Sequence, residues 1–399
     1  MLKNENLCVK IFEIEKIRGQ VMINEFDFRK YSEESLEDAV SLIKELCAIP
    51  APSGDELRRA EYCRDYLTSI GARGVYIDDA YNCVYPMNAD GSNELSVFVA
   101  HTDTVFPDTE RMPYSDDGVK LRSPGVGDDT ASLAVMLLAI KYLLKNGFKP
   151  QRGILFVANS CEEGLGNLKG TRKIFADYKG RIAEFVSFDG KIGTIADECV
   201  GSHRYEVSVK TPGGHSYSAF GNRNAIDVIA EMVKEIYSIE APQCGGYKTT
   251  YNVGTISGGT SVNTIAENAE MLCEYRSVSA ESLRIMKENF RRIFEKERLD
   301  ANVNVRVVGE RPCMEGVDQN KLDILLKKCE SAMSDTTGEP VKFSSSSTDC
   351  NIPLSLGIPA ICTAVYSGGG AHTRSEWVER ASLVPGLEIA LRTIYNVCS

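Results

Sequence analysis

Several short apolar runs in the first half of the chain end abruptly at charged or imidazole side chains. The run LSVFVA stops at His101, ILFVAN leads into the acidic pair Glu162 and Glu163, and EFVSF stops at Asp189. Runs of this length, bounded by turn residues, are typical of buried and largely parallel strands. Because ligands of open α/β sheets collect beyond the carboxyl ends of the strands, we expect these side chains to share one site.

Helical patterns lie between these runs and predict a sheet covered by helices. The segment SGDELRRAEYCRDYLTSIG opens with Ser53 and Glu56 at the spacing of a capping box and closes at Gly71. A second segment, TASLAVMLLAIKYLLKNG, closes at Gly147. Helix-like residues near 319–334 and the strand-like GIPAICTAV continue the pattern. We therefore predict an α/β fold with a mostly parallel, mixed sheet flanked by helices.

The pattern changes near residue 201. The alternating run RYEVSVK is followed by a helical pattern in NAIDVIAEMVKEIYSI, strands in YNVGTISGG and EMLCEYRSV, a helical pattern in SAESLRIMKENFRRIFEKERL and a strand in ANVNVRVV. The order βαββαβ is typical of a split-βαβ, or ferredoxin-like, α+β domain. We place an inserted domain at residues 201–308 and assign residues 1–200 and 309–399 to the surrounding domain.

Composition and charge narrow the range of partners. The 399 residues are 43% hydrophobic and 25% charged, which is typical of a globular chain long enough for two domains. A formal net charge of -11 disfavours nucleic acid and anionic membranes, so a short peptide or small ligand fits better. The longest apolar run, Leu133 to Ile140, is shorter than the roughly 20 residues needed to cross a bilayer.

The N-terminal residues and the cysteines predict a location. The segment MLKNENLCVKIFEIEK is interrupted by charges where a secretory signal needs an unbroken apolar stretch. The 13 cysteines are odd in number and form no CxxC pair, which argues against a disulfide framework and a thiolate zinc ribbon. We therefore expect a cytoplasmic protein without a membrane segment.

Three of the four histidines stand in unusual settings: His101 in HTDT, His215 in GGHSYS and His372 in GGGAHTRSE. Imidazole and carboxylate side chains are good zinc ligands, and a catalytic zinc keeps one position open for water. Asp103 follows His101 closely and can accept a hydrogen bond from its second ring nitrogen. Taken alone, the HTD pattern also fits a turn with a satisfied histidine.

Two acidic pairs also allow two interpretations, an ordinary structural role or metal binding. Asp128 and Asp129 precede a helix, where an acidic pair also serves as a cap. Glu162 and Glu163 follow a buried run, and burying two acids is costly unless a cation or a proton compensates. The order of the motifs favours a metal site: HxD after a strand, DD before a helix, EE after a strand, D after a strand, and a late histidine in a glycine-rich loop.

With these motifs in this order, the sequence resembles the two-zinc exopeptidases and deacylases, a family that includes peptidase T, carboxypeptidase G, aminoacylase, and the acetylornithine and succinyl-diaminopimelate deacylases. The resemblance covers the chain from about residue 36 onward. It implies two divalent ions per chain, zinc or alternatively cobalt or manganese. His101 and Asp189 would bind one ion, Glu163 and His372 would bind the other, and Asp128 would bridge both.

The same resemblance implies roles for further residues. Glu162 would be the general base, and the Asp103 carboxylate would orient the first histidine. The inserted domain resembles the family's lid and dimerisation domain, so we expect a homodimer through this domain and closure of the lid over the metals. His215 would stabilise the oxyanion from a neighbouring subunit, while Asn263 and Arg276 would hold the substrate.

The implied reaction is hydrolysis of an amide bond in a short peptide by a metal-activated water. Because aminopeptidases of the family tend to have an aspartate at the position of Asp189, we predict an aminopeptidase acting on di- or tripeptides, closest to peptidase T. An N-acyl-amino-acid deacylase and a carboxypeptidase use the same site and stay open. So do two other classes: a non-catalytic metal-binding protein and a thiol hydrolase that uses Cys161 or Cys350.

Overall fold

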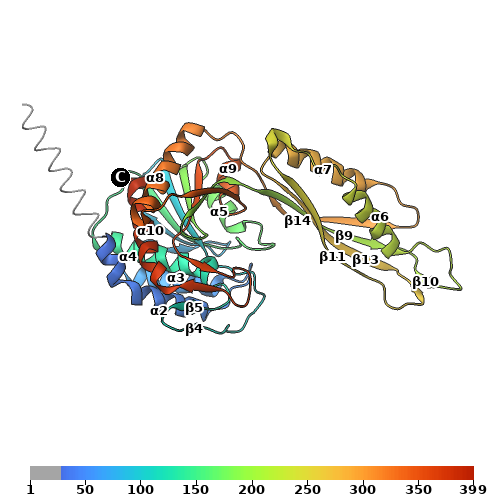
Figure 1. Cartoon of the computed structure of the whole chain (residues 1–399), viewed down its shortest axis with the longest axis horizontal. Coiled ribbons are helices and arrows are strands. Elements are labelled where there is room, and N and C mark those ends of the chain that lie inside the picture. The colour runs from blue at the N-terminus through green and yellow to red at the C-terminus, as the bar shows by residue number, and fades with distance from the viewer. Residues whose placement is uncertain (1–27) are drawn as a thin grey trace, which may run out of the picture.

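The computed structural model describes residues 28–399, and the N-terminal segment for which no secretory signal was predicted lies outside these described residues. The chain forms a larger body and an elongated second body, which are linked where the strands of the second body begin and end (Figure 1). Among residues 28–399, no helix is long and apolar enough to cross a membrane.

The larger body contains a mixed sheet with the strand order β1-β2-β6-β3-β7-β16-β8-β15. Its strands are β1 (Tyr76–Ile77), β2 (Cys83–Met87), β3 (Leu95–His101), β6 (Gly153–Asn159), β7 (Ile182–Phe188), β8 (Thr194–Cys199), β15 (Lys342–Ser346) and β16 (Ala360–Thr363). β3 pairs in parallel with β6 and β7, whereas β2 and β8 introduce antiparallel pairs. β3 and β6 are buried along their whole length. The predicted mixed α/β sheet is confirmed.

Helices pack against this sheet in more than one layer. They are α2 (Leu36–Cys47), α3 (Leu57–Ser69), α4 (Ser132–Lys145), α5 (Lys169–Asp177), α8 (Gln319–Thr337), α9 (Asn351–Ser355) and α10 (Leu383–Cys398), with short turns at η1 (Val126–Ala131) and η3 (Arg380–Ser382). α4 packs on β3 and β7, and it also contacts α2, α3 and α10. This placement explains why its sequence is apolar on nearly every side.

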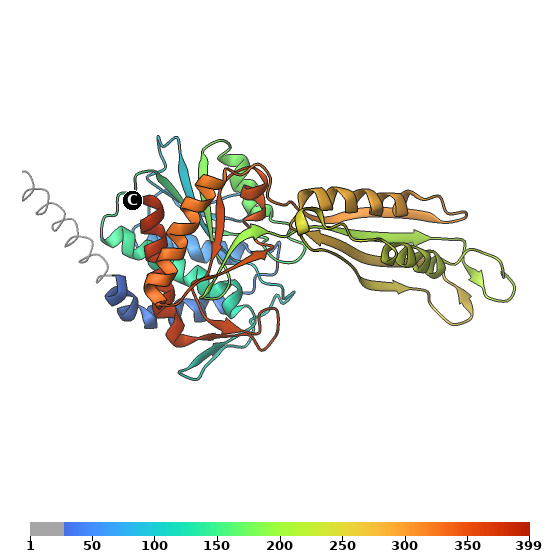
Figure 2. The same cartoon turned by 45° about the horizontal axis from the view of Figure 1, so that its top comes forward.

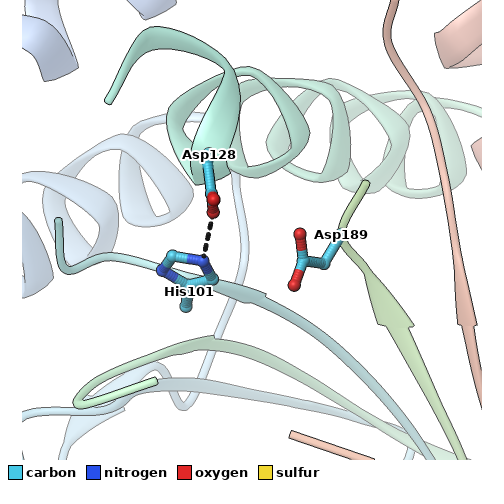
Figure 3. Close-up of side chains that lie close together, drawn as sticks. All are labelled: His101, Asp128 and Asp189. Atoms are coloured by element: carbon cyan, nitrogen blue, oxygen red, sulfur yellow. Dashed lines mark hydrogen bonds and ion pairs between the residues drawn. The ribbon is translucent and has the colours of Figure 1, made fainter. Parts of the chain in front are cut away.

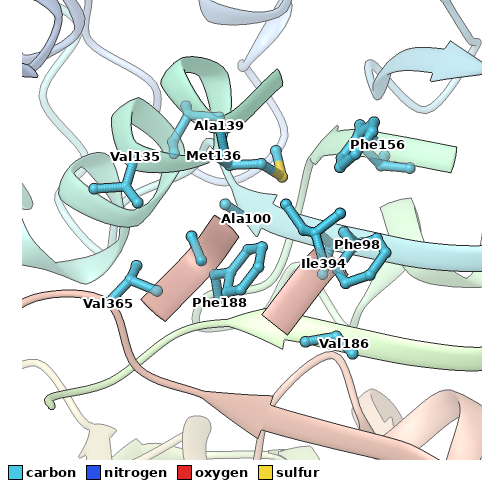
Figure 4. Packing of buried hydrophobic residues seen from close by; sticks show 14 of the residues in the cluster. Phe98, Ala100, Val135, Met136, Ala139, Phe156, Val186, Phe188, Val365 and Ile394 are labelled. Atoms are coloured by element: carbon cyan, nitrogen blue, oxygen red, sulfur yellow. The ribbon is translucent and has the colours of Figure 1, made fainter. Parts of the chain in front are cut away.

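The core forms where α4 and α10 meet the sheet. Figure 4 shows Phe98 of β3 and Phe156 of β6 in the same packed cluster as Met136 of α4 and Ile394 of α10. The rings of Phe98 and Phe156 are stacked with their centroids 5.6 Å apart. The apolar runs therefore bury their side chains here and leave their polar ends at the edge of the sheet.

The predicted capping box at the start of α3 is wrong. The helix begins at Leu57, and its N-cap residue Glu56 makes no side-chain capping bond. Ser53 Oγ instead donates to Asp103 Oδ2 at 2.6 Å, and Glu56 Oε1 accepts the backbone N–H of Cys161 at 3.0 Å. Both side chains therefore hold the loops that follow β3 and β6, a tertiary use that the local spacing does not reveal.

The second body has the predicted βαββαβ order (Figure 2). Its elements are β9 (Gly201–Lys210), α6 (Ala225–Tyr237), η2 (Cys244–Gly246), β11 (Thr249–Gly258), β13 (Asn268–Ser277), α7 (Ala280–Glu295) and β14 (Asn302–Arg311). The antiparallel sheet has the order β11-β13-β9-β14, and α6 and α7 both pack on β9 and β13. The last strand continues past the predicted run ANVNVRVV to Arg311. We call residues 201–311 the lid, after the role predicted for this domain.

Two smaller sheets hold loops in place. β10 (Gly214–His215) pairs with β12 (Thr264–Ile265) within the lid. In the larger body, β4 (Ser115–Asp116), β5 (Lys120–Arg122), β17 (Gly368–Gly369) and β18 (Trp377–Glu379) form a sheet in the order β17-β18-β5-β4. Because β17 and β18 flank the loop that carries His372, this pairing ties that loop to the segment preceding Asp128.

Candidate active site

Three parallel strands deliver polar side chains to the same edge of the larger sheet. β3 ends at His101, β7 is followed directly by Asp189, and the loop after β6 carries Glu162 and Glu163. Asp128 comes from the η1 turn before α4. Figure 3 shows the side chains of His101, Asp128 and Asp189 gathered from three different elements. The structure thus brings together residues that the sequence predicted to share a site.

The two carboxylate oxygens of Asp128 face two different histidines. Oδ1 lies 3.0 Å from His101 Nε2, and Oδ2 lies 3.1 Å from His372 Nε2. Ligand-type atoms of His101, Asp128 and Asp189 all lie within 4.8 Å of one another, and so do those of Asp128, Glu163 and His372. Asp128 is therefore shared by two clusters, each with three nitrogen or oxygen donors of the kind that a catalytic zinc site uses.

Asp103 contacts both His101 and the loop that carries Glu162 and Glu163. Its Oδ1 lies 3.4 Å from His101 Nδ1, and its backbone oxygen lies 3.1 Å from the same nitrogen. The carboxylate also accepts the backbone N–H groups of Glu162 (3.0 Å) and Glu163 (2.8 Å). Asp103 is fully buried. It therefore fixes the loop that carries the acidic pair as well as the ring of His101.

Asp129 does not cap α4. The N-cap residue is Ala131, and no side chain makes a capping bond there. Asp129 Oδ2 accepts the backbone N–H of His101 at 3.0 Å instead. The interpretation of the acidic pair as a helix cap is therefore wrong. Asp128 belongs to the cluster, and Asp129 binds the backbone of His101.

Burial and neighbouring acidic groups shift the pKa values of several side chains in the cluster. Burial, together with the charge of Asp128, raises the pKa of Asp189 to about 7, and burial raises the pKa of Glu162 well above its usual range. Hydrogen bonds to Asp128 and Glu163 raise the pKa of His372 to about 10. Glu163 Oε1 is buried and lies 3.1 Å from His372 Nε2. The donor set therefore fits divalent cations, whose charge would compensate these acids.

Glu376 fixes the loop that carries Asp128, and it was not among the residues predicted from the sequence. Its Oε1 accepts the backbone N–H groups of Gly127 (3.0 Å) and Asp128 (2.8 Å), and its Oε2 accepts that of Gly125 (2.8 Å). Glu376 is only 2% exposed. A Cβ atom at Gly127 would lie 2.9 Å from Glu376 Oε1, so the glycine permits this close approach. The sequence feature that could have indicated Glu376 is its place in GGGAHTRSE, the segment that also contains His372.

Replacing Glu376 by glutamine is expected to weaken metal binding by about 10- to 100-fold, as is typical when groups that orient metal ligands are lost. Glutamine keeps the size of the side chain, but its NH2 group cannot accept a backbone N–H. Titration calorimetry with zinc or manganese measures the effect. Glu379→Gln, which alters a nearby exposed acid, is the matched control. Unchanged affinity in Glu376→Gln would contradict the role assigned to this residue.

A pocket of about 520 Å³ is lined by residues of both the cluster and the lid. Its lining includes Asp128, Glu162, Asp189 and His372 on one side and Arg204, Arg276 and Arg311 on the other. The family resemblance implied a role for Arg276, whose Nε and Nη2 donate to Glu274 at 2.7 and 3.0 Å. Arg204 and Arg311 were missed because an arginine on an exposed-looking strand carries no distinctive local signal.

His215 and Asn263 do not line this pocket within one chain. His215 belongs to β10 and Asn263 immediately precedes β12, in the paired segments at the far end of the lid (Figure 1). Both residues are exposed, and His215 Nδ1 accepts the backbone N–H of Tyr217 at 3.2 Å. Their roles therefore stay predictions, and for His215 the predicted role is action from a second copy of the chain.

The two cysteines considered as nucleophiles are poorly suited to that role. Burial raises the pKa of the Cys161 thiol to about 12 and also raises that of Cys350. A reactive cysteine needs a lowered pKa, because the thiolate is the nucleophile. The site therefore does not favour a thiol hydrolase.

Residues 97–396 match the peptidase family M20/M25/M40. The chain belongs to this family. A peptidase M20 domain-containing protein of Schizosaccharomyces pombe is 26% identical, and the match covers 67% of this chain and 66% of that relative. Succinyl-diaminopimelate desuccinylase of Corynebacterium glutamicum is 24% identical, with 86% of this chain and 92% of the relative covered.

Solved structures share the fold over nearly the whole chain. Aminopeptidase PepT from Bacillus cereus has a TM-score of 0.69 at 23% identity, covering 91% of this chain and 98% of its own. A tripeptidase from Staphylococcus aureus has a TM-score of 0.70 at 20% identity, covering 90% and 97%. The predictions of family and fold are confirmed, and this family M20 protein is a hydrolase that acts on peptide bonds. Its relatives include peptidases and a deacylase, so they do not fix the substrate.

Proposed function

We propose that the protein is a metal-dependent exopeptidase that removes an amino acid from the free N-terminus of a short peptide, with tripeptides as the leading substrates. The observation that carries this proposal is the position of Asp128 between the His101–Asp189 cluster and the Glu163–His372 cluster. Imidazole and carboxylate donors in this arrangement fit two divalent ions, with zinc, cobalt and manganese as candidates.

The residues around this centre suit hydrolysis of an amide bond. Two divalent ions bound here would supply hydroxide from water at neutral pH and polarise the scissile carbonyl. Glu162 would accept the proton of the attacking water and return it to the leaving amine. Its carboxylate lies close to His101 and Glu163 and lines the pocket, which supports this role.

The lid would hold the substrate. The Arg276 guanidinium lines the pocket, and its planar fork suits a terminal carboxylate. His215 of a second chain would donate to the oxyanion, and Asn263 would contribute to substrate binding. This arrangement requires a homodimer formed through the lid and closure of the lid during the reaction. We place the enzyme in the cytoplasm.

Asp189 supports the aminopeptidase assignment, because aminopeptidases of the family that this sequence resembles tend to have an aspartate at this position. The likeness in fold to an aminopeptidase and to a tripeptidase over nearly the whole chain agrees with this assignment. The similarity to a desuccinylase makes N-acyl-amino-acid deacylation the second candidate. The two functions differ in whether the substrate amine is free or acylated.

The metal-loaded enzyme is expected to cleave a free tripeptide faster than the same tripeptide with an acetylated N-terminus, and faster than N-acetyl amino acids. A free amine can contact the carboxylates of the site, whereas an acetylated amine has lost its charge. Mass spectrometry of the products shows which end is released. Faster cleavage of the acylated compounds would support the deacylase, and release of the C-terminal residue would support a carboxypeptidase.

A further inference from the structure

The loop after β6 carries both members of the acidic pair in an uncommon backbone conformation. Cys161, Asn167 and Leu168 have φ values of 59°, 56° and 58°, although none of them is glycine. Non-glycine residues in this region persist only where surrounding contacts determine the conformation. We call residues 161–168 the base loop, because it contains Glu162.

One side chain of the lid binds the proposed base at two points. Arg311, the last residue of β14, donates from Nη1 to Glu162 Oε1 at 3.0 Å and from Nη2 to the backbone oxygen of Glu162. Nη1 also donates to the backbone oxygen of Ser347 at 3.0 Å. The side chains of Arg311 and Glu162 are each only 6% exposed. A single planar guanidinium thus fixes both the carboxylate and the main chain of Glu162.

Further contacts join the base loop and the following helix α5 to two lid strands, β9 and β14. Arg204 of β9 donates from Nη1 to the backbone oxygen of Gly164. The backbone N–H of Glu310 in β14 donates to Asn167 Oδ1 at 2.8 Å, and Arg172 of α5 donates to the backbone oxygen of Glu310. β9 and β14 pair with each other up to Arg311. A movement of the lid relative to the sheet would therefore be transmitted to the base loop.

We propose that Arg311 is a positioning residue that couples the lid to Glu162 and holds its carboxylate toward the reacting atoms. This inference rests on the proposed role of Glu162 as general base. Lysine keeps the charge but lacks the planar fork, so it cannot reproduce the paired contacts to the carboxylate and the backbone oxygen. Arg311 acts through Glu162, whereas a substrate-binding arginine would act independently of it.

The test compares Arg311→Lys and Arg311→Ala with the wild type on whichever amide substrate the wild type cleaves. Both variants are expected to lose about 100-fold in kcat, the size of effect typical when a catalytic group is misplaced by about 1 Å. KM and the number of bound metal ions should change little. Millimolar guanidinium should restore part of the activity of Arg311→Ala. Arg306→Ala, which removes an exposed arginine from the same strand, is the matched control and should behave as wild type.

A double variant separates positioning from substrate binding. In the Glu162→Ala background, Arg311→Lys should cause no further loss of the residual rate, because the two residues act as one unit. Wild-type kcat in Arg311→Lys, a raised KM with unchanged kcat, or loss of metal in parallel with activity would each overturn the proposal. If Arg311→Ala does not fold, the charge-preserving lysine variant decides. A wild type that cleaves only acylated amino acids overturns the aminopeptidase assignment, and the Arg311 comparison then proceeds on that substrate.

Discussion

Replacing Glu162 by alanine is expected to reduce kcat by about 10²- to 10⁴-fold, the usual contribution of a general acid or base. Binding of divalent ions should be nearly unchanged, because Glu162 is assigned to proton transfer and its Oε1 is held by Arg311. Steady-state kinetics on a free tripeptide and elemental analysis of the same preparation measure the two quantities together.

The neighbouring residue supplies the matched control. Glu163 lies 3.1 Å from His372 Nε2 and belongs to the cluster that also contains Asp128. Glu163→Ala should therefore lose bound metal, and activity should fall with it. If Glu162→Ala lost metal while Glu163→Ala kept it, the assignment within the acidic pair would be reversed.

Mixing two inactive variants is expected to restore activity if His215 acts across a dimer. A chain with His215→Ala still provides Glu162, and a chain with Glu162→Ala still provides His215. In a two-fold symmetric heterodimer one of the two sites is then complete, so statistical exchange should recover about one quarter of wild-type activity. Within one chain β10 lies at the end of the lid that points away from the larger body, which is the reason for this expectation (Figure 1).

Subunit exchange must be shown independently, for example by mass spectrometry of chains with different tags. Mixing two differently tagged Glu162→Ala preparations gives the background rate. Proven exchange without recovery above that background would refute action of His215 from the partner subunit. Full activity of the His215→Ala chain alone would remove the residue from the mechanism.

Much of the site could be predicted because the sequence pattern shows where each strand ends. The apolar runs before His101, Glu162 and Asp189 mark parallel strands, and parallel strands bring their carboxyl ends to one edge. Asp128 lies outside that argument, since it stands in a turn before a helix. Its bridging role was implied by the family resemblance, and the structure places it between the two histidines.

The rest could not be predicted, because it depends on contacts between distant segments. Ser53 and Glu56 have the local spacing of a capping box, yet buried groups in other loops bind them. Arg311 looks like an exposed residue at a strand end, but the lid turns it toward Glu162. Local patterns give periodicity and turns, whereas they contain no information on which distant partner satisfies a polar side chain.

The central claim is that each chain binds two divalent ions with Asp128 between them. The direct test is elemental analysis of protein that has been stripped with a chelator, reconstituted with zinc and freed of excess metal. We predict two ions per chain in the wild type and loss of both in Asp128→Ala, because the carboxylate faces both histidines. No more than one tightly bound ion per wild-type chain at saturation would contradict the claim.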